Sequence, residues 1–169
     1  MSSPEMLVAS QLATRSMSGG ERTQVRLSRE TVRLLQKVPL FSGLSRSHIR
    51  RLAGLAREAS FGPGRIIVEK GVRGDAFYLI LDGRAKVYGT VVPSGRALAR
   101  FGPGDFFGEM ALLDGGPRSA SVVAETRVAA IKIPRAGFRQ LLEKEPSVAL
   151  RILEEMARRA RPHEPTPTQ

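Results

Sequence analysis

The feature that most constrains the fold is a series of short apolar segments between residues 59 and 134. Each segment is rich in β-branched residues or alternates apolar with polar ones, and Gly, Pro or Asp separates it from the next. Short strands with turns between them are typical of antiparallel sandwiches and barrels. Because helical patterns flank the series, the sequence predicts an α+β, mainly β fold: an antiparallel β-roll, or double-stranded jelly roll, with N- and C-terminal helices. The segments are RIIVEKG, DAFYLILDG, RAKVYGTVV, RALARFGPG, SASVVAET and RVAAIKI.

Two turn signals divide this β-rich part. Asp82-Gly83 stands between two apolar runs and predicts a hairpin, because glycine accepts the positive φ that tight hairpin turns need. The tetrapeptide FGPG occurs at residues 61–64 and again at 101–104. One recurrence is too little for a solenoid, so we expect the same strand corner to be used twice in a roll.

The N-terminal flank divides into an irregular part and a helical part. Residues 1–29 are rich in Ser, Gly, Thr and Gln with little apolar periodicity, which predicts a mobile segment. Residues 30–58 have a helical pattern that is interrupted before Pro39, since the residue ahead of a proline is pushed out of the α region. Ser45 is predicted to cap the second helix, with Ile49 and Leu52 on its apolar face and arginines opposite.

The C-terminal flank, residues 135–161, is predicted to form helices with a break at Pro146, which a first helical turn tolerates. In the second helix an apolar stripe recurs at helical spacing. We expect this stripe to pack on the chain's own roll, and a homodimer through the C-terminal helix is the alternative. The Pro-rich residues 162–169 are predicted to form a disordered tail. The stripe consists of Ala149, Ile152, Leu153, Met156, Ala157 and Ala160.

The chain is basic, with 27 Lys and Arg against 16 Asp and Glu and a net charge of +11. The excess lies mainly in the two helical flanks and not in one Lys/Arg block, which favours a solvated basic surface over a nucleic-acid, membrane or acidic-protein partner. No apolar run approaches the roughly 20 residues that span a bilayer, and the N-terminus lacks the basic start of a secretory signal. We therefore expect no transmembrane segment and a cytoplasmic protein.

The composition disfavours several kinds of active site. The absence of Cys excludes a thiol nucleophile, thiolate zinc and cysteine-ligated iron–sulfur clusters. The two histidines, His48 and His163, are far along the chain from any cluster of Ser or carboxylate residues, and they form no pair at metal-ligand spacing. The β-rich part contains neither His nor Cys, so a haem would lack its axial ligands. We expect neither an enzyme nor a metal or haem protein.

Residues 106–122, FFGEMALLDGGPRSASV, carry the clearest chemistry. Gly108 permits close backbone approach, and a short helix after it offers unpaired N–H groups that favour a phosphate. Arg118 can pair with a phosphate through two parallel hydrogen bonds, and Glu109 can accept a hydrogen bond from a ribose 2′-OH. Such a pair suits a compact ribose phosphate. The alternative is an ion pair between Glu109 and Arg118 that pins the loop.

The segment FGEMALL followed by PRSASV resembles the phosphate-binding cassette of the cyclic nucleotide-binding domain family. This family includes the catabolite activator protein and the regulatory subunits of cyclic-AMP-dependent kinase. The resemblance covers roughly residues 35–161 and includes PLFSGLS at residues 39–45. It implies that residues 30–161 form one such domain, with helices at 30–58, the β-roll at 59–134, the cassette at 106–122 and helices at 135–161.

The resemblance also implies a role for each residue of the candidate site. Glu109 would accept from the ribose 2′-OH, and Arg118 would neutralise the cyclic phosphate. Arg159, or its neighbour Arg158, would stack on the purine from a closing C-terminal helix. Ser119 does not settle the choice between cyclic AMP and cyclic GMP, of which cyclic AMP is favoured. Backbone N–H groups at Gly108, Met110 and Ala111, with hydroxyl and backbone contacts from Ser119 and Ala120, would complete the site.

These implications predict a regulatory sensor whose ligand is a small-molecule cyclic nucleotide. Ligand binding would favour one placement of the flanking helices, and their movement would signal to a protein effector. Because no helix-turn-helix pattern follows the last helix, we expect a stand-alone sensor without a DNA-binding domain. Two alternatives stay open: a β-roll that binds no nucleotide and serves as a protein-interaction or dimerisation module, and a basic surface that binds nucleic acid.

Overall fold

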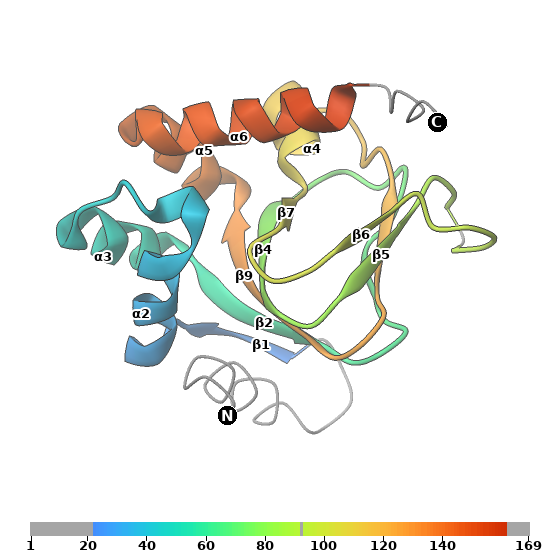
Figure 1. The fold of residues 1–169 in the computed structure, drawn as a ribbon, viewed down its shortest axis with the longest axis horizontal. Coiled ribbons are helices and arrows are strands. Elements are labelled where there is room, and N and C mark those ends of the chain that lie inside the picture. Colours follow the sequence, from blue (N-terminus) through green and yellow to red (C-terminus); the bar gives the residue numbers. More distant parts are fainter. Residues whose placement is uncertain (1–21, 92, 162–169) are drawn as a thin grey trace, which may run out of the picture.

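A computed structural model describes residues 22–91 and 93–161, and Figure 1 shows their arrangement. Helices lie toward both ends of this part of the chain, and strands fill most of the middle. The helical elements are α2 (Arg29–Lys37), η1 (Pro39–Phe41), α3 (Arg46–Leu55), α4 (Glu109–Asp114), α5 (Arg135–Lys144) and α6 (Pro146–Ala160). The strands are β1 (Arg22–Arg26), β2 (Arg57–Phe61), β3 (Ile66–Val68), β4 (Ala76–Asp82), β5 (Ala85–Tyr88), β6 (Ala99–Phe101), β7 (Phe106–Phe107), β8 (Ser121–Ala124) and β9 (Val128–Pro134).

The strands form two antiparallel sheets. A five-stranded sheet has the order β1-β2-β9-β4-β7, and a four-stranded sheet has the order β3-β8-β5-β6. Neighbours within a sheet come from distant parts of the chain, as β4 does with β9 and β5 with β8. In Figure 1, α5 and α6 lie across the top of the roll, and α2 and α3 lie at its left. The expected α+β, mainly β class, an antiparallel roll flanked by helices, is confirmed.

Strands β4 and β9 lie at the centre of the molecule and are buried on both faces. Successive residues of a strand point to opposite sides. Phe77 and Ile131 therefore pack toward the helices, whereas Tyr78 and Ala130 line the interior of the roll. A strand buried on both sides needs a continuous apolar run, and AFYLI in β4 supplies one.

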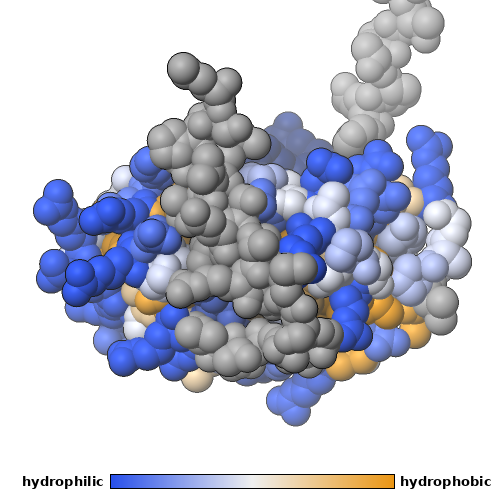
Figure 2. All heavy atoms as spheres, turned by 90° about the horizontal axis from the view of Figure 1, so that it is seen from below, coloured by the Kyte–Doolittle hydropathy of each residue, from blue (hydrophilic) through white to orange (hydrophobic). Residues whose placement is uncertain are grey.

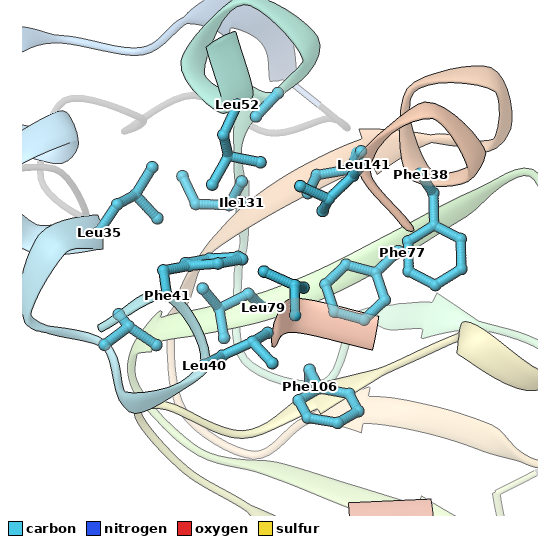
Figure 3. Close-up of a cluster of buried hydrophobic side chains, with 14 of the residues drawn as sticks. Leu35, Leu40, Phe41, Leu52, Phe77, Leu79, Phe106, Ile131, Phe138 and Leu141 are labelled. Atoms are coloured by element: carbon cyan, nitrogen blue, oxygen red, sulfur yellow. The ribbon is translucent and has the colours of Figure 1, made fainter. Parts of the chain in front are cut away.

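The hydrophobic cluster under the helices joins the two flanks of the chain (Figure 3). Phe77 of β4 stacks on Phe138 of α5 with ring centroids 4.9 Å apart. The ring centroid of Phe106 in β7 lies 5.4 Å from that of Phe77. Leu35 of α2 and Leu52 of α3 reach the same cluster. The short strand β7, which leads into the candidate site, is thus anchored in the main core.

Capping residues fix where the flanking helices begin. Ser28 accepts a hydrogen bond from the N–H of Thr31 and caps α2. Ser45 accepts from the N–H of His48 and caps α3, as the sequence predicts. Pro146 occupies the first turn of α6, where its missing N–H leaves no intrahelical bond unmade.

The two FGPG turns are built alike. Gly64 and Gly104 both have a positive φ, of 80° and 88°. Each donates its N–H to the carbonyl oxygen of a strand residue, Ala124 at 2.7 Å and Ile80 at 2.8 Å. The expectation that one strand corner is used twice is confirmed.

The prediction of a hairpin at Asp82-Gly83 is wrong. Gly83 has a positive φ of 87°, but β4 and β5 on either side of it belong to different sheets. A Cβ atom at Gly83 would lie 2.0 Å from the carbonyl oxygen of Arg127, so the turn runs closely over the connection between β8 and β9. The glycine serves this close approach, and the turn carries the chain from one sheet to the other.

The prediction that residues 1–29 form a mobile segment is wrong for residues 22–29. Residues Arg22–Arg26 form β1 against β2, and α2 begins at Arg29 after the Ser28 cap. The sequence RTQVR is too short and too polar to predict a strand by itself, and the edge of β2 supplies its backbone partners. Residues 1–21, and the tail expected at 162–169, lie outside the described residues.

Helix α6 packs on the molecule with a narrower face than the predicted stripe. Val148 and Ile152 are buried, and Met156 packs partly against the main core, so the packed row repeats every four residues. Leu153 is 58% exposed and its neighbour Leu150 is 57% exposed. The stripe therefore does not pack on the roll as a whole, and an apolar row stays at the surface. Like the other helices in the described part of the chain, α6 lacks the length and apolar character needed to cross a membrane.

Candidate functional site

A cavity of about 140 Å³ lies between the roll, α4 and the C-terminal end of α6. Its lining contains every residue of the candidate site predicted from the sequence, together with apolar side chains of the roll that sequence reasoning missed. They could have been found from the alternation of apolar residues along the short strands, since inward-facing residues line the interior of a roll. All eight residues of the candidate site line the cavity: Gly108, Glu109, Met110, Ala111, Arg118, Ser119, Ala120 and Arg159. The missed residues are Val68, Val87, Phe101, Phe107 and Val122.

Gly108 carries the chain from β7 into α4 and shapes the cavity wall. Its φ is 91°, in the left-handed region that favours glycine. A Cβ atom there would lie 2.5 Å from Nη1 of Arg118 and 2.8 Å from the carbonyl oxygen of Ala76. Glycine therefore allows the arginine to lie against the backbone at the start of α4. In the first turn of that helix, Met110 is half exposed and Ala111 is buried.

Glu109 is the carboxylate of the cavity, and it is almost fully buried. Its Oε1 atom lies 3.6 Å from Nη1 of Arg159 on α6. Burial raises the pKa of Glu109 above its usual value, although its own backbone N–H and the charges of Arg159 and Arg118 act in the opposite direction. The carboxylate has two oxygens and several acceptor positions, so it can also accept a hydrogen bond from a hydroxyl group.

Arg118 is the buried cation of the cavity, only 5% exposed. It donates from Nη1 to the carbonyl oxygen of Gly108 at 3.0 Å and from Nη2 to that of Ala76 at 2.7 Å. Nη2 also lies 3.4 Å from Oδ1 of Asp75, whose side chain is largely exposed. Burial lowers the pKa of Arg118, whereas the charges of Tyr78, Asp75 and Glu109 act to raise it. Solvent screens the Asp75 pair, so the guanidinium keeps much of its attraction for a second anion.

The alternative arrangement, in which Glu109 and Arg118 pair with each other, is not what the described residues show. Glu109 pairs with Arg159, and Arg118 pairs with Asp75. The two buried charges of opposite sign therefore face one cavity without being joined. A ligand with both a hydroxyl and an anionic group could contact each of them.

Arg159 closes the cavity from α6. It donates from Nε to Oε1 of Glu155 at 3.0 Å and from Nη2 to the carbonyl oxygen of Phe106 at 2.7 Å. Its guanidinium carbon lies 4.8 Å from the centroid of the Phe101 ring and 4.9 Å from that of Phe106. Arg158 is 71% exposed and pairs with Glu155 on the helix surface. Of the two arginines considered for contact with a base, Arg159 is the one at the cavity.

Ser119 and Ala120 follow Arg118 and lead into β8. Ser119 is exposed and Ala120 is half-buried. The next residue, Ser121, is fully buried, and its hydroxyl accepts from the N–H of Lys70 and donates to the carbonyl oxygen of Thr90, both at 2.9 Å. This buried hydroxyl, which sequence reasoning did not single out, holds the end of the cassette against the roll.

The cavity combines a buried cation, a buried carboxylate and an apolar wall, an arrangement that suits a small ligand with an anionic group, a hydroxyl and a flat apolar part. Within residues 22–91 and 93–161, no group of three or more His, Asp or Glu residues is placed so that it could hold a metal ion.

Residues 58–145 match the model of the cyclic nucleotide-binding domain family. The chain belongs to this family. A cAMP-dependent protein kinase regulatory subunit from Aspergillus fumigatus is 41% identical over 108 residues, which are 64% of this chain and 26% of that protein. A CRP-like cAMP-activated global transcriptional regulator from Mycobacterium tuberculosis is 32% identical over 130 residues, 76% of this chain and 58% of that protein. This domain thus spans about a quarter to three-fifths of the length of these two relatives.

Solved structures of related domains have the same fold. The regulatory domain of Toxoplasma gondii PKA with cAMP has a TM-score of 0.65 at 27% identity, covering 76% of this chain and 48% of that one. The catabolite activator protein of Thermus thermophilus has a TM-score of 0.63 at 34% identity, covering 72% of this chain and 57% of that one. The resemblance seen in FGEMALL and PRSASV is confirmed, and the chain forms a cyclic nucleotide-binding domain with a β-roll fold.

Proposed function

We propose that this domain binds a purine cyclic nucleotide, cAMP in preference to cGMP, and that binding moves α6 to signal to a protein effector. The observation that carries the proposal is that Arg118 and Glu109 line one cavity while each pairs with another residue. The cyclic phosphate would take the guanidinium of Arg118, and the ribose 2′-OH would donate to Glu109. The rings of Phe101 and Phe107 would contact the apolar faces of the ligand.

The remaining site residues would complete the contacts to the phosphate. Backbone N–H groups at Gly108, Met110 and Ala111 lie at the start of α4, where such groups favour an anion. Ser119 and Ala120 would add a hydroxyl and a backbone N–H next to Arg118. The preference for cAMP rests on the relatives, which are named for cAMP or solved with it. The proposed activity is binding and regulation, without a catalytic step.

The cavity has to widen to admit a nucleotide. Its volume of about 140 Å³ is below the roughly 300–1,000 Å³ that small-molecule sites usually have. Arg159 is the contact that can give way, because its ion pair with Glu109 occupies the carboxylate that a ribose hydroxyl would need. Once displaced, the guanidinium can stack on the purine, and the C-terminal end of α6 is free to change position.

The exposed row on α6 supports a protein as the recipient of this signal. Leu150 and Leu153 are more than half exposed on the helix that carries Arg159. Apolar side chains on an element that moves with the ligand can bind a partner in one ligand state only. The partner would be an effector or a second copy of the chain, and sedimentation of the protein alone with and without cAMP separates the two.

The first test is a screen of cAMP, cGMP and linear 5′-AMP by thermal unfolding and titration calorimetry. A ligand that binds only the folded state stabilises it by about 2.7 kcal/mol at a hundredfold excess over the dissociation constant. We expect cAMP to raise the melting temperature most, cGMP less and 5′-AMP least. No shift with any nucleotide would favour an interaction module that binds no nucleotide.

Replacement of Glu109 by glutamine is expected to weaken cAMP binding about tenfold or more, because hydrogen bonds to charged groups contribute roughly 1.5–3 kcal/mol. The loss should be much smaller for 2′-deoxy-cAMP, which lacks the hydroxyl that Glu109 would bind. Calorimetry with both ligands measures the difference. Glu154→Gln, an exposed position on α6, is the matched control and should change neither affinity. Equal losses for the two ligands would remove the assigned hydroxyl contact.

A further inference from the structure

A second concavity lies between α2 and α3, away from the nucleotide cavity. Its volume is about 570 Å³, and none of its lining residues lines the nucleotide cavity. In Figure 2 the left of the molecule, where Figure 1 places α2 and α3, is mostly hydrophilic. We call this concavity the α2–α3 groove. It is lined by Arg29, Val32, Arg33, Gln36, Arg46 and Arg50.

The charges of the groove are of one sign. Each helix contributes two exposed arginines one turn apart, Arg29 with Arg33 on α2 and Arg46 with Arg50 on α3. None of these four guanidinium groups has a hydrogen-bond or ion-pair partner among residues 22–91 and 93–161. Exposed arginines elsewhere in the same part of the chain, such as Arg51 and Arg139, also lack a partner, so the groove is distinguished by having four such groups line one concavity. The groove thus concentrates positive charge that the described residues do not neutralise.

Nearby carboxylates do not supply the missing negative charge. The sequence has no Asp or Glu between Glu30 and Glu58. Glu30 is exposed and outside the groove lining, and Glu58 accepts hydrogen bonds from the backbone of Ser28 and the hydroxyl of Thr31. Within the described residues, neither carboxylate therefore balances the arginines of the groove.

The arrangement costs stability while the groove is empty. Arg29 and Arg46 are the first residues of their helices, where the helix dipole is positive and a cation is unfavourable. Like charges one turn apart, such as Arg33 with Arg29, also destabilise a helix. An anion in the groove would offset these repulsions, because it would attract each of the arginines. Local features that conflict with stability are most often explained by function.

We propose that the α2–α3 groove binds an anion with two or more linked phosphate groups, as in inorganic polyphosphate or the polyphosphate of a nucleotide. Guanidinium groups pair with phosphate oxygens through two parallel hydrogen bonds, and arginine is preferred for this over lysine. Four such groups exceed what one phosphate can neutralise. The volume of about 570 Å³ lies within the roughly 300–1,000 Å³ range of small-molecule sites.

Macromolecular anions fit the groove less well. Single-stranded nucleic acid is usually held by aromatic stacking along a continuous basic track, and the lining residues that the structure describes include no aromatic side chain. An acidic peptide would need apolar anchors for affinity, and among the described residues Val32 is the one apolar residue of the lining. The observed set of residues favours a compact, highly charged ligand.

The test is calorimetric titration of the full 169-residue chain with sodium triphosphate and, in parallel, with a nucleoside triphosphate. The groove variant carries Arg33→Gln and Arg50→Gln. The matched control carries Arg51→Gln and Arg139→Gln, which remove the same charge from exposed positions outside the groove. We expect one triphosphate per chain, affinity about tenfold or more weaker in the groove variant, and little change in the control. Tighter binding of the nucleoside triphosphate than of triphosphate would identify a nucleotide as the source of the phosphates.

Thermal unfolding gives an independent readout. Without anion, the groove variant should melt at the same or a higher temperature than the parent, because like-charge repulsion is removed. Triphosphate should raise the melting temperature of the parent and control but not of the groove variant. The site assignment fails if triphosphate does not bind, if the control loses as much affinity as the groove variant, or if a poly-glutamate peptide or an oligonucleotide needs these arginines while triphosphate does not. Because cAMP binding is measured separately, failure here leaves the nucleotide cavity untouched.

Discussion

Replacing Arg118 by alanine is expected to weaken cAMP binding by roughly 2–5 kcal/mol, because truncating one partner of a buried charge pair leaves the other charge without a partner. The structure gives this residue the position that the effect requires: it is 5% exposed and lines the cavity together with Glu109. Arg118→Lys keeps the charge but not the fork of donors, so its affinity should lie between those of the parent and the alanine variant. Calorimetry with cAMP measures all three proteins.

The same substitution will also affect the fold, and a control has to separate the two effects. Arg118 donates to the carbonyl oxygens of Gly108 and Ala76, so alanine removes one buried hydrogen bond from each of them. Arg135 is a matched control because it also donates to backbone carbonyl oxygens, that of Gly74 at 2.9 Å and that of Ala111 at 3.4 Å, yet its own side chain does not line the cavity. Arg135→Ala should lower the free energy of unfolding without a comparable loss of affinity. A tight-binding Arg118→Ala variant would disprove the phosphate contact.

The polar half of the cavity could be predicted from the sequence because it lies in one short segment. Glu109 and Arg118 are separated by a single helix and a Gly-rich turn, so their local spacing already indicates that they are neighbours. Spacing could not tell whether they pair with each other, because an ion pair and a ligand site use the same two side chains. The structure decides this by giving each another partner, Arg159 and Asp75.

Contacts between distant segments were beyond local reasoning. Arg158 and Arg159 are adjacent on one helix, and the direction each takes depends on how α6 docks. That docking is fixed by Val148, Ile152 and Met156 in the core, and it turns Arg159 toward the cavity and Arg158 to solvent. The same limit applies to β1 and to the turn at residue 83, where the edge of β2 and the path between two sheets decide the outcome.

Replacing Phe77 by alanine is expected to lower the free energy of unfolding by about 3–5 kcal/mol, the usual cost of removing a buried phenylalanine ring. Phe77 is fully buried in the cluster of Figure 3, with Phe138 at 4.9 Å and Phe106 at 5.4 Å between ring centroids. The loss is large compared with the roughly 5–15 kcal/mol by which domains are stable. Urea unfolding without ligand measures it.

Phe61→Ala is the matched control, because Phe61 is only half-buried and touches Tyr78 edge-on at 6.2 Å. It should cost clearly less than Phe77→Ala, and equal costs would contradict the central place given to Phe77. Phe77→Ala should also affect the nucleotide cavity, because Phe77 packs against Phe106, whose carbonyl oxygen accepts a hydrogen bond from Arg159. Loss of this support should loosen the start of the cassette, so the variant should bind cAMP more weakly than Phe61→Ala does, and saturating cAMP should restore part of its stability by mass action.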